Sequence, residues 1–171
     1  VIVDSLKAGC DVISDKPLSI TINDHEEIEK LLTENPDRRL LNLLTLRGVP
    51  HWRSLHNLVL EGKIGLSAFV HVRMAVRLKR EQRPPWFLDI NRSGGLFLDL
   101  LIHGLDQVEW VSGRRITAVT AVTGNFAHPG DPDFRDHASV FCELDSGASA
   151  VVEGQRMLPD TKGSDYRMHV A

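Results

Sequence analysis

The chain has 171 residues, of which 42% are hydrophobic, and a formal net charge of −3 at pH 7. This length suits one full domain or parts of two, and the apolar content is sufficient for a packed core. The acidic balance leaves no basic stripe to neutralise phosphates, so we expect no nucleic-acid partner.

The two cysteines, Cys10 and Cys142, are far apart in the sequence. They do not resemble a disulfide framework, which favours a reducing, cytoplasmic location. No apolar run approaches the ~20 residues of a membrane helix, and there is no signal peptide, so we expect no membrane association. The chain lacks an initiator Met, opens within "VIVDSLKAGC" and stops within "YRMHVA". We therefore expect both ends to be cut points in a longer polypeptide.

The first 46 residues alternate between helix and strand patterns. Residues 1–9 read as the end of a helix, and residues 11–15, "DVISD", as a short buried strand. A second helix begins at Ser19 or Thr21, and "RRLLNLLTL", residues 38–46, has the length of a strand. This order is typical of an α/β parallel sheet.

The pattern changes after Arg47. Residues 49–65 form an amphipathic helix, and residues 66–79 alternate as a long strand with one polar face. Residues 81–93 read as a loop, and residues 93–113 as a helix. Further strands are expected at 115–124, 137–147, 148–157 and from 164 onward. Helices followed by consecutive strands indicate an α+β layer, in which an open, mainly antiparallel sheet carries helices on one face.

The helix at 93–113 carries three titratable groups within an apolar stretch. With Asp99 at zero and 100° per residue, His103 lies at about 40° and Asp106 at about 340°. They share one face, which a solvated polar stripe would explain. However, Leu96 and Trp110 lie on the same face, which indicates that it is partly covered. A histidine one turn from a carboxylate in a half-covered site is suited to general acid/base catalysis.

A second candidate is Lys16, directly after the strand at 11–15. Ligands of α/β sheets bind outside the carboxyl ends of the strands, and Pro17 fixes the backbone there. Taken alone, Lys16 is more simply read as a surface lysine in a turn.

Three stretches together resemble the Gfo/Idh/MocA family of NAD(P)-dependent oxidoreductases. They are "AGCDVISDKPLS", "LRGVPHWRSLHNLVLEGKIG" and "GGLFLDLLIHGLDQVEWVSG". The resemblance implies a Rossmann domain, of which residues 1–46 would be the C-terminal remnant. Residues 47–171 would then be an α+β substrate-binding and oligomerisation domain with a large open sheet. It also implies NAD or NADP as cofactor, a sugar, polyol or related CH–OH substrate, and a homo-oligomer assembled through the sheet.

The resemblance also implies residue roles. Lys16 and Pro17 match the motif near the nicotinamide and the reacting oxygen. His103 matches the acid/base, Asp99 its carboxylate partner that contacts substrate or orients the histidine, and Asp106 a structural or substrate-facing position. In physical terms, a neutral imidazole can accept the hydroxyl proton while an ammonium stabilises the developing alkoxide. No metal is expected, since the histidines and cysteines show no convincing ligand spacing.

Two features limit the resemblance. Asp15 stands where the family usually has Glu, and the sequence contains no G-x-G-x-x-G phosphate-binding turn. We therefore expect the isolated chain to be inactive. Arg83 and Trp86, in the loop at 81–93, are candidate sugar ligands, although exposed loop residues usually have no special role. The rival interpretation is a non-catalytic binding or assembly module that uses the open sheet as an interaction surface.

Overall fold

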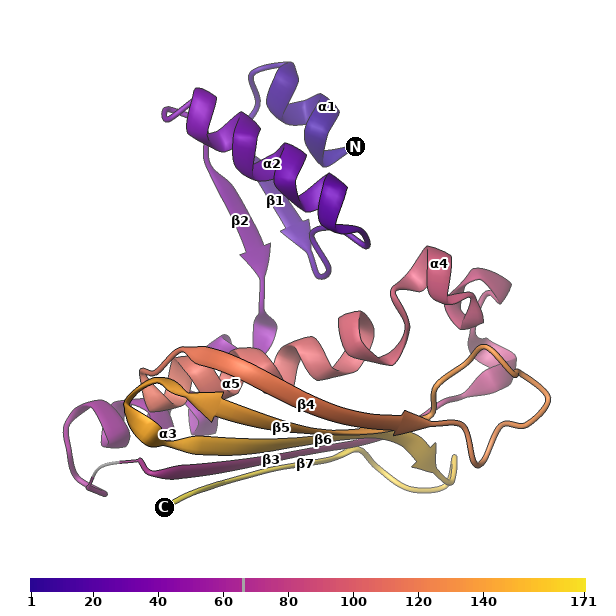
Figure 1. Ribbon diagram of the computed structural model, residues 1–171. Coiled ribbons are helices and arrows are strands. Elements are labelled where there is room, and N and C mark those ends of the chain that lie inside the picture. Colours follow the sequence, from indigo (N-terminus) through magenta and orange to yellow (C-terminus); the bar gives the residue numbers. More distant parts are fainter. Residues whose placement is uncertain (66) are drawn as a thin grey trace. The chain divides into compact units, whose positions relative to one another are not determined.

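The computed structural model describes residues 1–65 and 67–171, which divide into two compact units, Val1–Leu44 and Thr45–Ala171. The first unit contains helices α1 (Ile2–Lys7) and α2 (Ile22–Glu34) and a parallel pair of strands, β1 (Val12–Asp15) and β2 (Leu40–Leu43). The expected α/β order is confirmed (Figure 1). Helix α2 begins after Thr21, whose hydroxyl accepts a hydrogen bond from the Asp24 backbone N–H at 3.1 Å.

Strand β1 differs from the buried strand expected at residues 11–15. Its side chains alternate between half-buried and exposed, and Ile13 is 71% exposed. The reason is that α1 and α2 lie over one face of the strand pair, where Leu6 and Ile28 are buried. The opposite face of this two-stranded sheet bears the exposed side chains.

The second unit is built on a five-stranded sheet in the order β4-β5-β6-β3-β7. The pair β3–β6 is parallel, and the other three pairs are antiparallel, which confirms the open, mainly antiparallel sheet. Leu66, the first residue of the strand expected at 66–79, lies outside the described residues. The strand bounds are β3 Phe69–Arg77, β4 Ile116–Gly124, β5 His137–Leu144, β6 Ser149–Leu158 and β7 Asp165–Val170.

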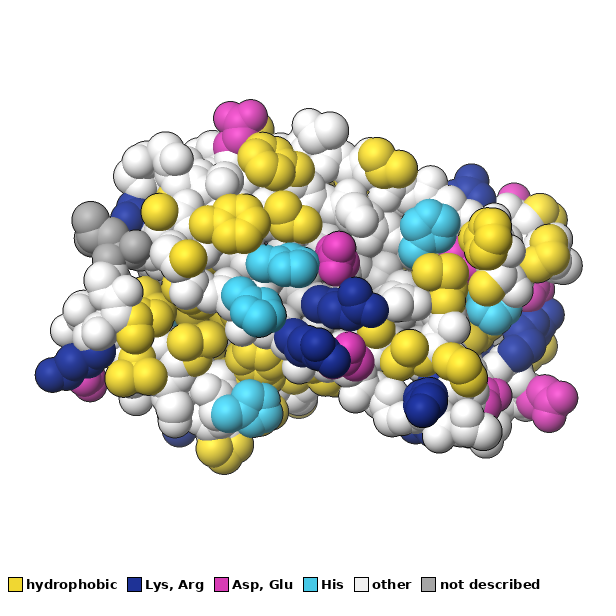
Figure 2. Space-filling model, turned by 90° about the horizontal axis from the view of Figure 1, so that it is seen from below, with side chains coloured by type: hydrophobic (Ala, Val, Ile, Leu, Met, Phe, Trp, Pro, Cys, Tyr) yellow, Lys and Arg dark blue, Asp and Glu magenta, His cyan; other side chains and the backbone are white. Residues whose placement is uncertain are grey.

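Helices lie on one face of this sheet (Figure 1). They are α3 (Pro50–Leu60), α5 (Ile102–Ser112) and the short turns that precede them. Alternate residues of β3, β5 and β6 point toward the helices and form the main core; among them are Val70, Val72, Met74, Val140, Ala150 and Val152. We call the opposite face of the sheet the outer face. Figure 2 views it directly, with histidine, basic and hydrophobic side chains gathered near its centre.

The segment expected to be one helix at 93–113 is interrupted. Helix α4 (Ile90–Ser93) ends at Gly94, whose φ of 73° is left-handed, and a π-helical turn, η4 (Phe97–Leu101), leads into α5. A Cβ on Gly94 would lie 2.5 Å from the Leu98 side chain. The paired glycines are therefore required by the tight turn between α4 and η4. Because Asp99 lies within the wider π turn, the uniform 100° per residue assumed for this face does not hold.

The segment expected to be a loop at 81–93 is also partly helical. It contains the end of the 3₁₀ turn η2 (Arg80–Gln82), the 3₁₀ turn η3 (Pro85–Leu88) and α4. Pro84 and Pro85 fix backbone φ near the value of a helical turn. The Asp89 carboxylate then caps α4 by accepting a hydrogen bond from the Asn91 backbone N–H at 2.9 Å.

Candidate active site

Helix α5 and the π turn hold the three polar residues singled out in the sequence. Asp99 and His103 are half-buried, while the Asp106 side chain is 8% exposed. The helix lies very close to the sheet at Gly104, where a Cβ would approach the Val152 side chain to 2.6 Å. Direct contact between the helix backbone and the core therefore fixes how far His103, the adjacent residue, lies from the sheet.

Asp99 is held from the sheet by Arg156, a residue that sequence reasoning missed. Arg156 is only 5% exposed, and its guanidinium donates a hydrogen bond to the Asp99 carboxylate. A second donor of the same guanidinium reaches the backbone carbonyl of Arg77 at 3.2 Å. The sequence pattern that could have identified Arg156 is the alternation along β6, which places Arg156 on the same helix-facing side as Ala150 and Val152. An arginine at an inward position requires a buried partner.

A phenylalanine connects Arg156 to the segment at 80–93. The Phe87 ring is 7% exposed and belongs to a small second core with Leu78 and Phe134. The guanidinium carbon of Arg156 lies 5.0 Å from the centre of the Phe87 ring, and that of Arg83 lies 4.3 Å from it. Two cations thus flank one aromatic ring beside Asp99.

Arg83 is fixed within this cluster by its own backbone contact. Its Nε donates to the carbonyl oxygen of Leu78 at 3.2 Å. Burial and, to a smaller extent, the positive charge of Arg156 lower the pKa of Arg83, and the charge of Asp99 offsets part of this effect. Trp86 lies nearby but is 43% exposed. Its ring meets the Phe87 ring edge-on, with centroids 6.2 Å apart, so both loop residues chosen from the sequence contact Phe87.

Asp106 is engaged by Arg47 of the 3₁₀ turn η1 (Thr45–Gly48). The Arg47 Nε lies 3.1 Å and 3.0 Å from the two carboxylate oxygens, and a terminal nitrogen also donates to the same carboxylate. This hydrogen bonding raises the pKa of Arg47. The sequence left a structural or a substrate-facing role open for Asp106. Its largely buried carboxylate, paired with Arg47, favours the structural role.

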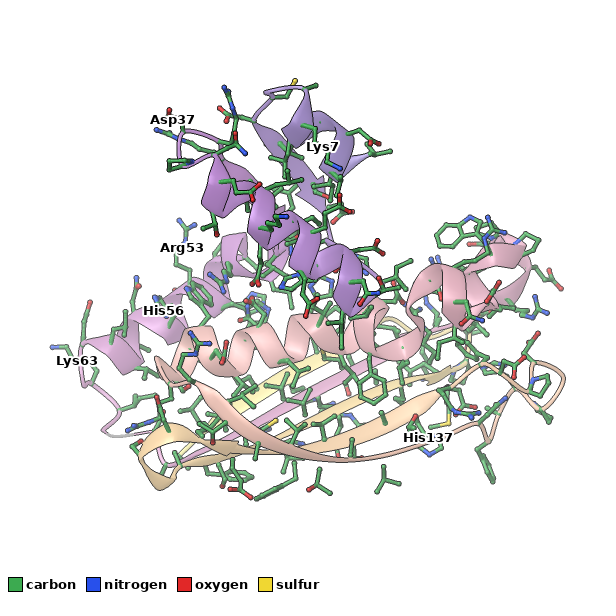
Figure 3. The ribbon with its side chains drawn as sticks, turned by 45° about the horizontal axis from the view of Figure 1, so that its top comes forward. Lys7, Asp37, Arg53, His56, Lys63 and His137 are labelled. Atoms are coloured by element: carbon green, nitrogen blue, oxygen red, sulfur yellow. The ribbon has the colours of Figure 1, made fainter. Side chains whose placement is uncertain are left out.

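The neighbourhood of Trp110 explains why an indole occurs on the polar face of α5. Its ring stacks on His56 of α3 with centroids 4.2 Å apart, and His56 Nδ1 lies 2.8 Å from the Trp110 carbonyl oxygen. Figure 3 labels His56 on this helix. Helix α3 therefore covers this end of the polar face, as Trp110 had indicated.

Lys16 and Pro17 belong to the first unit, at the carboxyl end of β1. Both are half-buried, and the Lys16 backbone N–H donates to the Asp15 carboxylate at 2.8 Å. The peptide bond between Lys16 and Pro17 is cis. Convergence of Lys16 with His103 on one substrate stays a prediction.

A pocket lies beside Arg156, at the carboxyl ends of β3 and β6. It has a volume of about 270 Å³, and its lining includes Lys79, His128 and Arg156. The His128 Nε2 lies 3.2 Å from the Arg156 carbonyl oxygen. The loop at 125–136, which carries His128, had no sequence motif, so this part of the molecule was not anticipated.

Within 1–65 and 67–171, no three or more His, Cys, Asp or Glu side chains are grouped so that they could hold a metal ion. In the same residues, no helix combines the length and apolar character needed to cross a membrane.

Comparison with known proteins identifies relatives along the whole chain. The chain is 26% identical to the Bacillus subtilis protein named uncharacterized oxidoreductase YrbE, over 99% of this chain and 48% of that protein. It is 28% identical to myo-inositol 2-dehydrogenase of Thermotoga maritima, over 99% of this chain and 49% of that protein. The chain therefore spans about half the length of these relatives.

The crystal structure of myo-inositol 2-dehydrogenase from Lactobacillus plantarum superposes with a TM-score of 0.87. The match covers 99% of this chain and 50% of that one at 22% identity, and it supports the fold alone. Residues 52–171 match the family model described as the GFO/IDH/MocA C-terminal domain. Because this model covers more than half of the chain, the chain belongs to the Gfo/Idh/MocA family.

Proposed function

We propose that this chain is the substrate-binding part of an NAD(P)-dependent dehydrogenase. Its substrate is a sugar, polyol or related molecule whose CH–OH group is oxidised to a carbonyl. The observation that carries the proposal is that two half-buried residues, Asp99 in η4 and His103 at the start of α5, lie in the family's domain, with Asp99 held by the buried Arg156. Relatives named as inositol dehydrogenases support a polyol as the substrate class.

The side chains of this unit provide a proton acceptor and its support. His103, as a neutral imidazole, accepts the hydroxyl proton of the substrate. Asp99 stabilises the resulting imidazolium or holds the reacting sugar hydroxyl. Because Arg156 is itself fixed by the Arg77 carbonyl, it holds the Asp99 carboxylate in one position and so pre-organises the site.

The cofactor site fits this chain only in part. Lys16 and Pro17 follow β1 at the strand end where α/β sheets bind ligands, and we propose that they lie at the nicotinamide end of the cofactor. The sequence holds no glycine-rich turn to receive the pyrophosphate. When bound, the nicotinamide supplies the hydride acceptor. We propose that Lys16 stabilises negative charge on the substrate oxygen as its proton leaves.

The proposal is tested by a screen of sugars and polyols with NAD and NADP on the full-length polypeptide, repeated on His103→Ala. We expect kcat to fall at least about 100-fold in this variant, since general-base catalysis contributes roughly 10²- to 10⁴-fold. The matched control is His51→Ala, because His51 is an exposed histidine on α3. Unchanged turnover in His103→Ala would remove the acid/base assignment.

The same assay on the purified 171-residue chain separates the two halves of the proposal. We expect no turnover and little affinity for NAD(P), because the phosphate-binding turn is absent from this sequence. Turnover by the chain itself would contradict this expectation. Absence of turnover by the full-length polypeptide with every substrate would instead favour the binding or assembly module.

A further inference from the structure

Arg83 is anchored at two points. Its guanidinium carbon lies over the Phe87 ring, 4.3 Å from the ring centre, and its Nε donates a hydrogen bond to the Leu78 carbonyl. Its two terminal nitrogens form no hydrogen bond to any other residue in the described part of the chain. Since the ring contact and the Nε hydrogen bond both restrict the guanidinium, its terminal nitrogens remain as donors for a ligand.

The charge around Phe87 is unbalanced. Arg156 also lies against this ring, at 5.0 Å, and its guanidinium is hydrogen-bonded to Asp99. No acidic side chain among the described residues forms an ion pair with Arg83. Burial and the charge of Arg156 lower the pKa of Arg83, and the charge of Asp99 offsets only part of this effect, so a further neighbouring anion would stabilise the Arg83 cation.

We propose that the substrate carries a carboxylate or phosphate group and that Arg83 binds this group through its terminal nitrogens. The inference rests on the proposed dehydrogenase function and narrows its substrate class to acidic sugars or polyols. Both anions offer paired oxygens that match a guanidinium edge. The location is suitable, because Arg156 connects the Phe87 ring directly to Asp99, the proposed substrate-facing carboxylate.

The test compares neutral and anionic forms of the same molecule on the full-length polypeptide. Glucose is assayed beside glucuronate and glucose 6-phosphate, and myo-inositol beside a myo-inositol monophosphate. We expect the highest kcat/KM to belong to an anionic compound and its KM to rise with ionic strength. The carboxylate and phosphate arms show which of the two anions is used.

Arg83→Gln assigns the effect to one side chain. We expect it to raise the KM of the anionic substrate about 10- to 100-fold, the loss associated with one charge-assisted contact, and to change the KM of the neutral compound less than about 3-fold. Arg83→Lys keeps the charge but loses the planar edge, and is expected to be intermediate. Arg92→Gln is the matched control, because Arg92 is an exposed arginine on α4.

The outcomes separate this inference from the function on which it rests. If only neutral compounds are turned over, or if Arg83→Gln affects neutral and anionic substrates equally, Arg83 has a structural role and the inference is wrong while the dehydrogenase stands. If no compound is turned over, the proposed function fails and this inference fails with it.

Discussion

Asp136 is the most deeply buried acidic side chain in the described part of the molecule, with an exposure of 0%. One carboxylate oxygen accepts hydrogen bonds from the backbone N–H groups of Phe126 and Ala127, at 2.9 Å and 2.6 Å. The other oxygen lies 2.7 Å from the His137 Nδ1, at the start of β5 (Figure 3). Burial would raise the pKa of Asp136, but the bonds from His137, Ala127 and Phe126 together hold it below its usual value. The ionised carboxylate therefore closes the loop at 125–136.

The lowered pKa of Asp136 gives a prediction about stability against pH. A carboxylate whose folded pKa lies below the unfolded value of about 3.9 contributes stability above that pH, and the contribution is lost as pH falls toward the folded pKa. We expect Asp136→Asn to lower the free energy of unfolding by about 1–3 kcal/mol at pH 7. The difference between the two proteins should shrink below about pH 4.

Urea denaturation at several pH values measures this difference. Asp133→Asn is the control, because Asp133 is an exposed carboxylate in the same loop. A gap between wild type and Asp136→Asn that stays constant from pH 7 to pH 3 would show that the carboxylate charge does not contribute.

At the scale of elements, the contact between α5 and the sheet determines the depth of the site. Gly104 faces Val152 on β6, and Gly154 on the same strand faces Leu101 at the end of η4. A Cβ at Gly154 would lie 2.5 Å from the Leu101 side chain. Two glycines, one on each element, thus allow the helix and the strand to approach more closely than side chains would permit.

Gly104→Ala tests this close approach. Alanine is favoured over glycine in a helix by about 1 kcal/mol, so a purely local effect would be stabilising. The new Cβ would lie 2.6 Å from the Val152 Cγ1 and 3.1 Å from the Met74 sulfur, and these core atoms have little room to move. We expect net destabilisation of about 1–3 kcal/mol and, because His103 is displaced, a lower kcat.

Thermal unfolding and steady-state kinetics of Gly104→Ala in the full-length polypeptide measure the two effects. Gly163→Ala is the control, since no heavy atom lies within 4 Å of a Cβ built there. A variant more stable than the wild type would show that α5 can move away from the sheet with no loss in the free energy of unfolding.

The sequence patterns predicted the strands better than they predicted the site, for a physical reason. Alternation along residues 66–79 reports burial directly, so Val70 was assignable to the apolar face of its strand without tertiary information. The π turn at Asp99 has no comparable periodic signal. The contact between Arg156 and Asp99 joins residues 57 positions apart, and only the fold brings them together.

At the scale of the whole second unit, the outer face combines exposed apolar groups with paired charges. Phe141 is 46% exposed and alternates along β5 with buried residues; Val122 on β4 is 70% exposed and pairs with Ser139, which is on the same exposed side of β5 as Phe141. Near the centre, Arg73 lies 3.7 Å from the Glu153 carboxylate and 3.5 Å from that of Asp165. Charges of both signs beside apolar groups suit a self-complementary contact between two copies related by a two-fold axis.

We therefore expect Phe141→Glu to weaken self-association of the full-length polypeptide through the outer face. A buried phenylalanine at the centre of an interface commonly contributes about 2 kcal/mol or more, and a glutamate there would also require desolvation. The matched control is Leu58→Glu, which replaces a residue of similar exposure, 42%, on α3. Analytical ultracentrifugation over a range of concentrations should show a lower oligomer fraction for Phe141→Glu and an unchanged fraction for Leu58→Glu. The expected assembly would be contradicted if the wild type were monomeric at all concentrations, or if both variants assembled as the wild type does. The outer face would then be a solvent-exposed surface whose charges pair only within one chain.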